Sequence, residues 1–313
     1  MKKMILAAVA LFAFMPVFAQ ISVEAEAASE RYSQRYDLLV SKLGPGGVGI
    51  ETLLENWTKV DPDNRKLVLA KYAYYLTKSR TSGITGRKTK KYLGNEPLFS
   101  LKDSTGTEVY YFEEISYDDS LYTEALRNID RAAKLFPLDL ELRFAKAAAL
   151  TGYEKENPDM ALAFLEKLAD EYYAGADRPW KYAEADVDGE FFQGAMQEYC
   201  YTFYNIGSPG SYEAFRSLSE KMLSKVPSST MFLSNLGSYW LVVAKKPKTA
   251  LKYYNKVLKI KPDDYTAAKN CVLLSRMEKN VKLEKKYLPM LIESSPDETE
   301  RRSAEARLEF LTK

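Results

Sequence analysis

One spacing recurs along this chain and limits the folds that are open to it. An apolar residue is followed by apolar residues four and seven positions later and by proline twelve positions later, as in Ala250, Tyr254, Val257 and Pro262. Positions with these separations share one face of an α-helix, and proline ends a helix or starts the connection after it. We therefore expect several helices that pack in the same way. The copies begin at Ile50, Ala125, Ala161 and Ala250, and in the third copy Tyr173 replaces the proline.

The fullest copy lies within the stretch from Pro227 to Pro262. An earlier helical segment of this stretch carries Leu236, Gly237 and Trp240 at helical spacing. A helix pair with these positions resembles the tetratricopeptide repeat, a unit of about 34 residues. The distance from Gly237 to Ala250 is one residue longer than the usual spacing of that family. The difference predicts an extra residue in the turn between the two helices.

The resemblance implies an all-α fold, a right-handed superhelix of about six tetratricopeptide-like helix pairs. One pair cannot bury its apolar face alone, whereas stacked pairs bury a continuous core and each contacts only its neighbours. We expect a single helical repeat domain over residues 31–313. The highly charged segment from Asp297 to Phe310 is predicted to be a C-terminal capping helix that covers the final pair.

The regular spacing is interrupted twice. Residues 98–101 and 109–112 form two β-prone runs on either side of an Asp-Ser-Thr-Gly turn sequence. The pattern predicts that residues 79–119 are an insertion with a β-hairpin, placed between the two helices of one repeat. The second interruption, residues 174–188, is predicted to be a loop.

The first residues have the features of a secretory signal peptide, which we assign to residues 1–19. Lys2 and Lys3 precede the apolar run from Met4 to Phe18, and Ala19 fits the cleavage site. Residues 20–30 are expected to be a flexible start. No cysteine stands at the cleavage point, and no other stretch is apolar enough to span a bilayer. The sequence predicts a periplasmic or secreted protein, with a retained N-terminal anchor as the alternative.

The composition excludes several classes of function. The chain has 45 basic and 43 acidic residues, and removal of Lys2 and Lys3 leaves equal numbers. A neutral chain has no broad field to attract nucleic acid or an anionic membrane. The absence of histidine excludes Ser-His-Asp and Cys-His catalysis and every histidine-containing zinc site. Cys200 and Cys271 are expected to be buried and unpaired, and no metal or cofactor is predicted.

Loop residues are candidates for ligand binding. Arg87 and Lys88 belong to a basic cluster in the insertion that would suit a phosphate or an acidic sugar, with a solvated basic loop as the alternative. Tyr92, Trp180 and Tyr182 lie where a helical core does not obviously claim them. If these rings were exposed and adjacent, they would form a surface on which a sugar could stack.

Acidic residues give two further hypotheses. The alternating acids from Glu184 to Glu190 suggest calcium, but Ala195 stands where an EF-hand loop needs glutamate. We therefore expect Asp188 to cap the helix that follows, since acids are favoured at the positive end of a helix. Paired carboxylates would support glycosidase chemistry, but the sequence singles out no pair, so no catalytic residue is predicted.

The resemblance to tetratricopeptide repeats implies an adaptor whose first helices hold a peptide or a partner protein. By position, Lys146, Asn235 and Ser238 lie on or near these first-helix surfaces. We therefore expect a non-enzymatic binding or scaffold protein of the bacterial cell envelope. The alternatives are a glycan- or cell-wall-binding protein that uses loop aromatics and, least favoured, a carboxylate-based glycan-processing enzyme.

Overall fold

The computed structural model describes residues 5–313, with side chains from residue 24 onward. Positions 1–4 of the predicted signal peptide (residues 1–19) lie outside the described residues. The side chains of its other residues are not described. Helix α1 (Ile5–Leu43) takes in residues 20–30, for which the sequence predicted a flexible start. The Ser29 hydroxyl of this helix accepts a 2.8 Å hydrogen bond from the Trp57 indole and donates one of 2.7 Å to Asp61. These bonds tie the segment to the neighbouring helix.

The chain divides into two compact units, where the sequence predicted a single domain. The first unit comprises Met1–Lys88, Pro97–Ala149 and Pro179–Asp186, and the second comprises Thr89–Glu96, Leu150–Arg178 and Val187–Lys313. Over the residues that the structure describes, no helix is long and apolar enough to cross a membrane.

The first unit contains two complete helix pairs and the start of a third. After α1 come α2 (Ile50–Val60), α3 (Arg65–Ser79), α4 (Asp119–Leu135) and the first part of α5 (Leu140–Glu154). The Asn64 side chain caps α3 by accepting the Lys66 and Leu67 N–H groups, and the Asp118 side chain caps α4 by accepting the Leu121 N–H group. The recurring spacing correctly identified six of the buried positions of this unit, namely Ile50, Leu54, Trp57, Ala125, Ile129 and Ala132.

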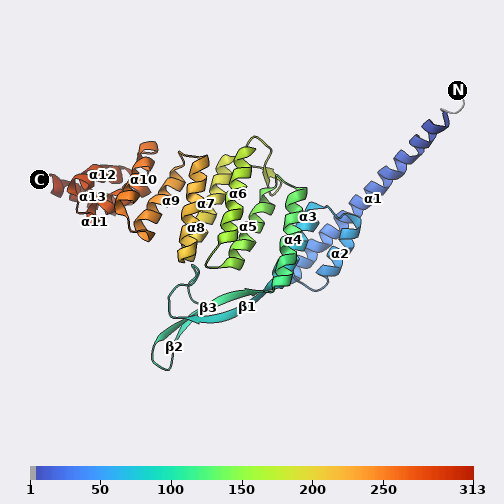
Figure 1. Ribbon diagram of the computed structural model, residues 1–313, viewed down its shortest axis with the longest axis horizontal. Helices are drawn as coiled ribbons and strands as arrows, with labels where there is room; N and C mark the ends of the chain where they lie inside the picture. Colours follow the sequence, from blue (N-terminus) through green and yellow to red (C-terminus); the bar gives the residue numbers. More distant parts are fainter. Residues whose placement is uncertain (1–4) are drawn as a thin grey trace. The chain divides into compact units, whose positions relative to one another are not determined.

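A three-stranded antiparallel sheet is inserted between α3 and α4. Its strands are β1 (Arg80–Arg87), β2 (Phe99–Lys102) and β3 (Glu108–Tyr117), in the order β1-β3-β2. The predicted hairpin is confirmed as β2–β3, and Gly106 adopts a φ of 80° in its turn. Strand β1 pairs with β3 over its whole length and was not predicted. The sheet projects from the helices of its own unit (Figure 1).

The second unit continues the helical repeat. Its elements after α5 are α6 (Asp159–Ala174), α7 (Gly189–Ile206), α8 (Pro209–Lys225), α9 (Thr230–Ser238), the π-helix η1 (Tyr239–Val243), α10 (Pro247–Ile260), α11 (Tyr265–Met277), α12 (Val281–Ser294) and α13 (Glu298–Thr312). Cys200 and Cys271 are buried and unpaired, as predicted. Among the described helices, α1 packs with α2, α3 with α4, α7 with α8, α9 with α10 and α11 with α12, and α13 packs on α12. This succession confirms an all-α helical repeat of the tetratricopeptide type with an inserted sheet.

The extra residue after Gly237 lies in a helix and not in the predicted turn. The π-helix η1 contains it. There the Ala244 N–H donates to the Tyr239 carbonyl at 3.0 Å, which is five residues earlier, whereas an α-helix bonds to the residue four earlier. A π-turn accepts one additional residue without ending the helix. The first helix of this pair therefore continues through Val243.

Candidate binding groove

The second unit contains a groove. It lies on the face formed by α7, α9 and α11, which are the first helices of successive pairs. Its volume is about 250 Å³. Helices α8 and α10 and the π-helix η1 complete its walls. The lining residues are Gln197, Tyr201, Tyr204, Phe215, Asn235, Ser238, Leu241, Val242, Tyr254 and Asn270.

Two side-chain amides at the floor of the groove hold each other in place. The Asn235 amide nitrogen donates to Oε1 of Gln197 at 2.7 Å, and the Gln197 amide nitrogen donates to Oδ1 of Asn235 at 3.0 Å. Asn235 also donates to the Ser219 hydroxyl at 3.2 Å, which uses both of its amide hydrogens. Asn235 is buried and Gln197 is half-buried. Gln197 therefore presents an oriented amide that retains one N–H and one oxygen lone pair for a ligand.

The rest of the floor is formed by a buried tyrosine. Tyr254 is fully buried, and its hydroxyl group is 3.1 Å from the Ser238 hydroxyl. Burial raises the pKa of Tyr254 to about 12, so the ring stays neutral over the physiological range. Asn235 and Ser238, both on the first helix of their pair, thus line the same groove.

Exposed apolar side chains lie at the rim. Tyr201 is 60% exposed and Val242 is 51% exposed, although both belong to helices. Val242 reaches the groove from the π-helix, in which one additional residue turns the following side chains by about 100° relative to an uninterrupted α-helix. The inserted residue is therefore part of the architecture of the groove.

No lysine, arginine, aspartate or glutamate occurs among the residues that line this groove. The lining combines side-chain amides, hydroxyl groups and apolar surface. Such a surface offers paired donors and acceptors to a peptide group and apolar contact to its side chains, with no fixed charge to favour a charged ligand.

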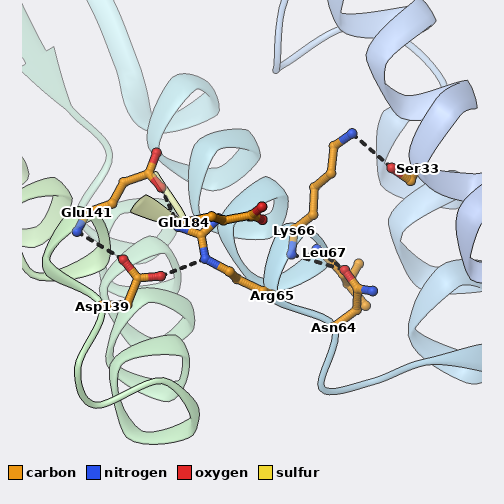
Figure 2. A network of polar contacts seen from close by, with 8 residues as sticks. All are labelled: Ser33, Asn64, Arg65, Lys66, Leu67, Asp139, Glu141 and Glu184. Carbon is orange, nitrogen blue, oxygen red and sulfur yellow. Dashed lines mark hydrogen bonds and ion pairs between the residues drawn. The ribbon is translucent and has the colours of Figure 1, made fainter. Parts of the chain in front are cut away.

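A second cavity lies in the first unit beside Arg65, with a volume of about 550 Å³ and a lining that includes Phe136, Leu138 and Pro179. Figure 2 shows how Arg65 is held: its Nε donates to Asp139 at 2.6 Å and its terminal group bonds to Glu141. A Glu184 carboxylate oxygen is 4.0 Å from Nη1 of Arg65. The arginine is thus neutralised by acids of its own unit, and its contacts connect the starts of α3 and α5.

The loop at residues 174–188 contributes a short hairpin to this cavity, formed by β4 (Lys181–Tyr182) and β5 (Ala185–Asp186). The Lys181 N–H donates to the Leu138 carbonyl at 2.9 Å. Trp180 is 3% exposed, so it packs as a core residue, while Tyr182 is 38% exposed and lies 6.4 Å from the Phe144 ring. These two aromatics therefore do not form the exposed pair of rings that sugar stacking would need.

The acidic run that suggested calcium has other partners. The Asp188 side chain accepts the Phe191 N–H at 2.9 Å and caps α7, as predicted. Among the described residues, no cluster of three metal-binding side chains is found.

The remaining predicted site residues lie elsewhere. Lys146 forms a 2.6 Å ion pair with Asp130, which joins α5 to α4. Arg87 is 4.0 Å from Glu114 on the neighbouring strand, and Lys88 follows it at the exposed end of β1. Tyr92 is half-buried and forms a bridge with Asn95.

Of the ten residues that line the groove, the sequence proposed only Asn235 and Ser238 as binding residues. The eight that it did not propose include Gln197, Val242 and Asn270. Asn270 could have been found, because it follows Pro262 by eight residues just as Asn235 follows Pro227. Val242 could not, because its position depends on the π-helix.

The fold defines a class, the helical repeat proteins that resemble tetratricopeptide repeats. No family model and no curated protein matches the sequence. Among solved structures, one of PilF from Pseudomonas aeruginosa is similar over 62% of this chain and 78% of that chain, with 15% sequence identity and a TM-score of 0.37. The assignment of the fold therefore depends on the helix pairs of this chain.

Proposed function

We propose that this protein is a non-enzymatic scaffold that binds a peptide or an extended segment of a partner protein in the groove of its second unit. The observation that carries the proposal is the uncharged lining, in which oriented amides and exposed apolar side chains come from successive first helices. Fold resemblance alone would name no site.

The lining suggests how a peptide would be held. The Gln197 amide, fixed by Asn235, offers one donor and one acceptor to a backbone peptide group, as a neighbouring strand would. Tyr201 and Val242 offer apolar contact to side chains on either side of that group. Since no ion pair would fix the ligand, an internal segment suits the groove better than a charged chain terminus.

We further propose a location in the bacterial cell envelope, periplasmic or secreted. The support comes from the N-terminal sequence, with its basic start, apolar run and small residue at position 19. Processing would be tested by mass determination of the N-terminus of protein purified from the periplasmic fraction.

The function is tested by photo-crosslinking. A photoreactive phenylalanine analogue at position 201 would lie at the groove, and the same residue at position 252 would lie on the exposed surface of the second helix α10. With envelope extract, we expect position 201 to give a discrete adduct whose peptide can be identified, and position 252 to give none. Equal labelling from both positions would contradict the proposal.

The same lining supports a second candidate, a neutral glycan. Tyrosine rings with side-chain amides and no charge also suit an uncharged sugar, and here they come from the groove and not from the loop aromatics. Calorimetric titration with neutral cell-wall oligosaccharides distinguishes the two candidates. A glycan site would give a saturable heat of binding, whereas a peptide site would give none.

A further inference from the structure

The inserted sheet has one apolar face. Gly86, Tyr111 and Phe99 are directly opposite one another across the three strands, and side chains alternate between faces along each strand. The face that carries Tyr111 therefore also carries its neighbours at every second position. We call this the apolar face, and its large apolar residues include Ile84, Phe99, Leu101, Val109, Tyr111 and Ile115. Glu113, opposite Ile84, also lies on this face, where it accepts a 2.7 Å hydrogen bond from the Ser82 hydroxyl.

Much of this face is open to solvent. Ile84 is 63% exposed, Leu101 57% and Phe99 43%. The Phe99 and Tyr111 rings stack on each other at 4.8 Å across β2 and β3. Exposed apolar surface of this kind, held on a regular sheet, is typical of an interaction site.

Strand β1 forms one edge of the sheet, and that edge lacks the usual protection. Seven of its eight residues are exposed, and alternate backbone N–H and C=O groups of an edge strand point away from its single neighbour. Natural edges are commonly blocked by charges, proline or bulges. Residues 81–86 have none of these, since their sequence is Thr-Ser-Gly-Ile-Thr-Gly and their pairing with β3 is continuous.

A glycine opens the apolar face toward this edge. A methyl group at Gly86 would lie 3.3 Å from Cε1 of Tyr111 and 3.1 Å from Val109. Because Gly86 has no side chain, β1 does not screen the Tyr111 ring from a strand placed beside it.

Charges at the two ends of β1 indicate the partner. Arg80 and Lys88 are both exposed and flank the uncharged stretch. A second copy of this chain is a poor partner, because pairing Ile84 with its equivalent would place Arg80 opposite Lys88 of the other copy. A strand with acidic ends would place opposite charges there.

We propose that the free edge of β1 binds an extended segment of a partner protein as a fourth strand. The segment has alternating apolar residues that lie beside Ile84 and Tyr111, and an acidic residue at each end that faces Arg80 or Lys88. This surface belongs to the first unit and is independent of the proposed groove, so either proposal can fail alone.

The test uses a nine-residue peptide, blocked at both termini, with aspartate at positions 1 and 9, valine at positions 3, 5 and 7, and threonine elsewhere. Its palindromic pattern suits either strand direction. We expect saturable binding that slows hydrogen exchange in residues 80–88 of the full chain. A lysine-ended peptide is expected to bind about tenfold more weakly, and a peptide with N-methylated valines to show no binding.

Two matched variants locate the site. Ile84→Lys and Leu101→Lys change residues of similar exposure on the same face, at opposite edges of the sheet. Ile84→Lys should lower the affinity for the aspartate-ended peptide by about tenfold or more, and Leu101→Lys should lower it by less than about twofold. Unchanged exchange in residues 80–88, or equal effects of the two variants, would overturn the proposal.

Discussion

Gly237 of α9 lies against the ring of Tyr254 of α10, so closely that a methyl group at position 237 would be 2.6 Å from Cε1 of that ring. Tyr254 is fully buried, and its hydroxyl group is 3.1 Å from that of Ser238. The tyrosine cannot withdraw without losing this contact and opening a cavity. Glycine at position 237 is therefore what lets the two helices approach at the floor of the groove.

Gly237→Ala is expected to destabilise the protein by about 1–3 kcal/mol, the usual cost of overpacking a core. The measurement is the free energy of unfolding from urea titration. Gly194→Ala is the matched control, because a methyl group at Gly194 of α7 would meet nothing within 4 Å. Because alanine is favoured over glycine in a helix interior, Gly194→Ala should raise the free energy of unfolding by about 0.5–1 kcal/mol. A loss at position 194 as large as that at 237 would contradict the packing argument.

Glu284 of α12 is a buried carboxylate that connects three helices. Arg307 of α13 donates to it at 2.9 and 3.0 Å, and Arg276 of α11 donates at 2.7 Å. Glu284→Gln should reduce the free energy of unfolding by about 2 kcal/mol, since all three charge-assisted bonds are weakened or lost. Glu309→Gln is the matched control, because Glu309 forms an exposed pair with Lys313. This variant should change the free energy of unfolding by less than about 0.5 kcal/mol.

The same carboxylate predicts a pH dependence. Hydrogen bonds from Arg307, and then from Arg276, hold the pKa of Glu284 below its ordinary value. The folded pKa is thus lower than the unfolded value of about 4.3, and the stabilisation is complete above that pH and lost as pH falls through the folded pKa. The difference between wild type and Glu284→Gln should therefore be constant near neutral pH and shrink below about pH 4. A difference that grows on acidification would exclude this role.

Arg65 links the starts of α3 and α5 through a forked contact with two carboxylates. Lysine keeps the charge but cannot reach Asp139 and Glu141 with a planar group, so Arg65→Lys should cost about 1–2 kcal/mol in thermal or urea unfolding. Arg131 forms a 2.7 Å pair with Asp63 in which both side chains are largely exposed. Arg131→Lys should therefore be almost neutral, and a similar loss in both variants would remove the special role of Arg65.

The helical repeat could be predicted because it is encoded by local spacing. Ala250, Tyr254 and Val257 are all fully buried, as their positions on one helix face required. The turn of the β2–β3 hairpin was recognisable from Gly106 and its polar neighbours. Strand β1 was not, because Gly83 and Gly86 interrupt the alternation that identifies a strand, and its pairing comes from β3, far along the chain.

The groove was only partly predictable. Asn235 and Ser238 follow from the repeat position on a first helix. The amide of Gln197 matters because it meets Asn235 across 38 residues of sequence, a contact that no local pattern reports. The π-helix could not be predicted from the sequence either, because one extra residue is compatible with both a longer turn and a wider helix.

The most direct test of the account is the affinity of the segment identified by crosslinking for two matched variants. Val242 lies in the groove and Ile260 at the end of α10, and their exposures are similar, at 51% and 48%. Isothermal titration should show that Val242→Asp weakens binding by about tenfold or more, because it places a charge in an uncharged groove, whereas Ile260→Asp leaves affinity within about twofold. Equal affinities for wild type and Val242→Asp would contradict the central claim that this groove is the binding site.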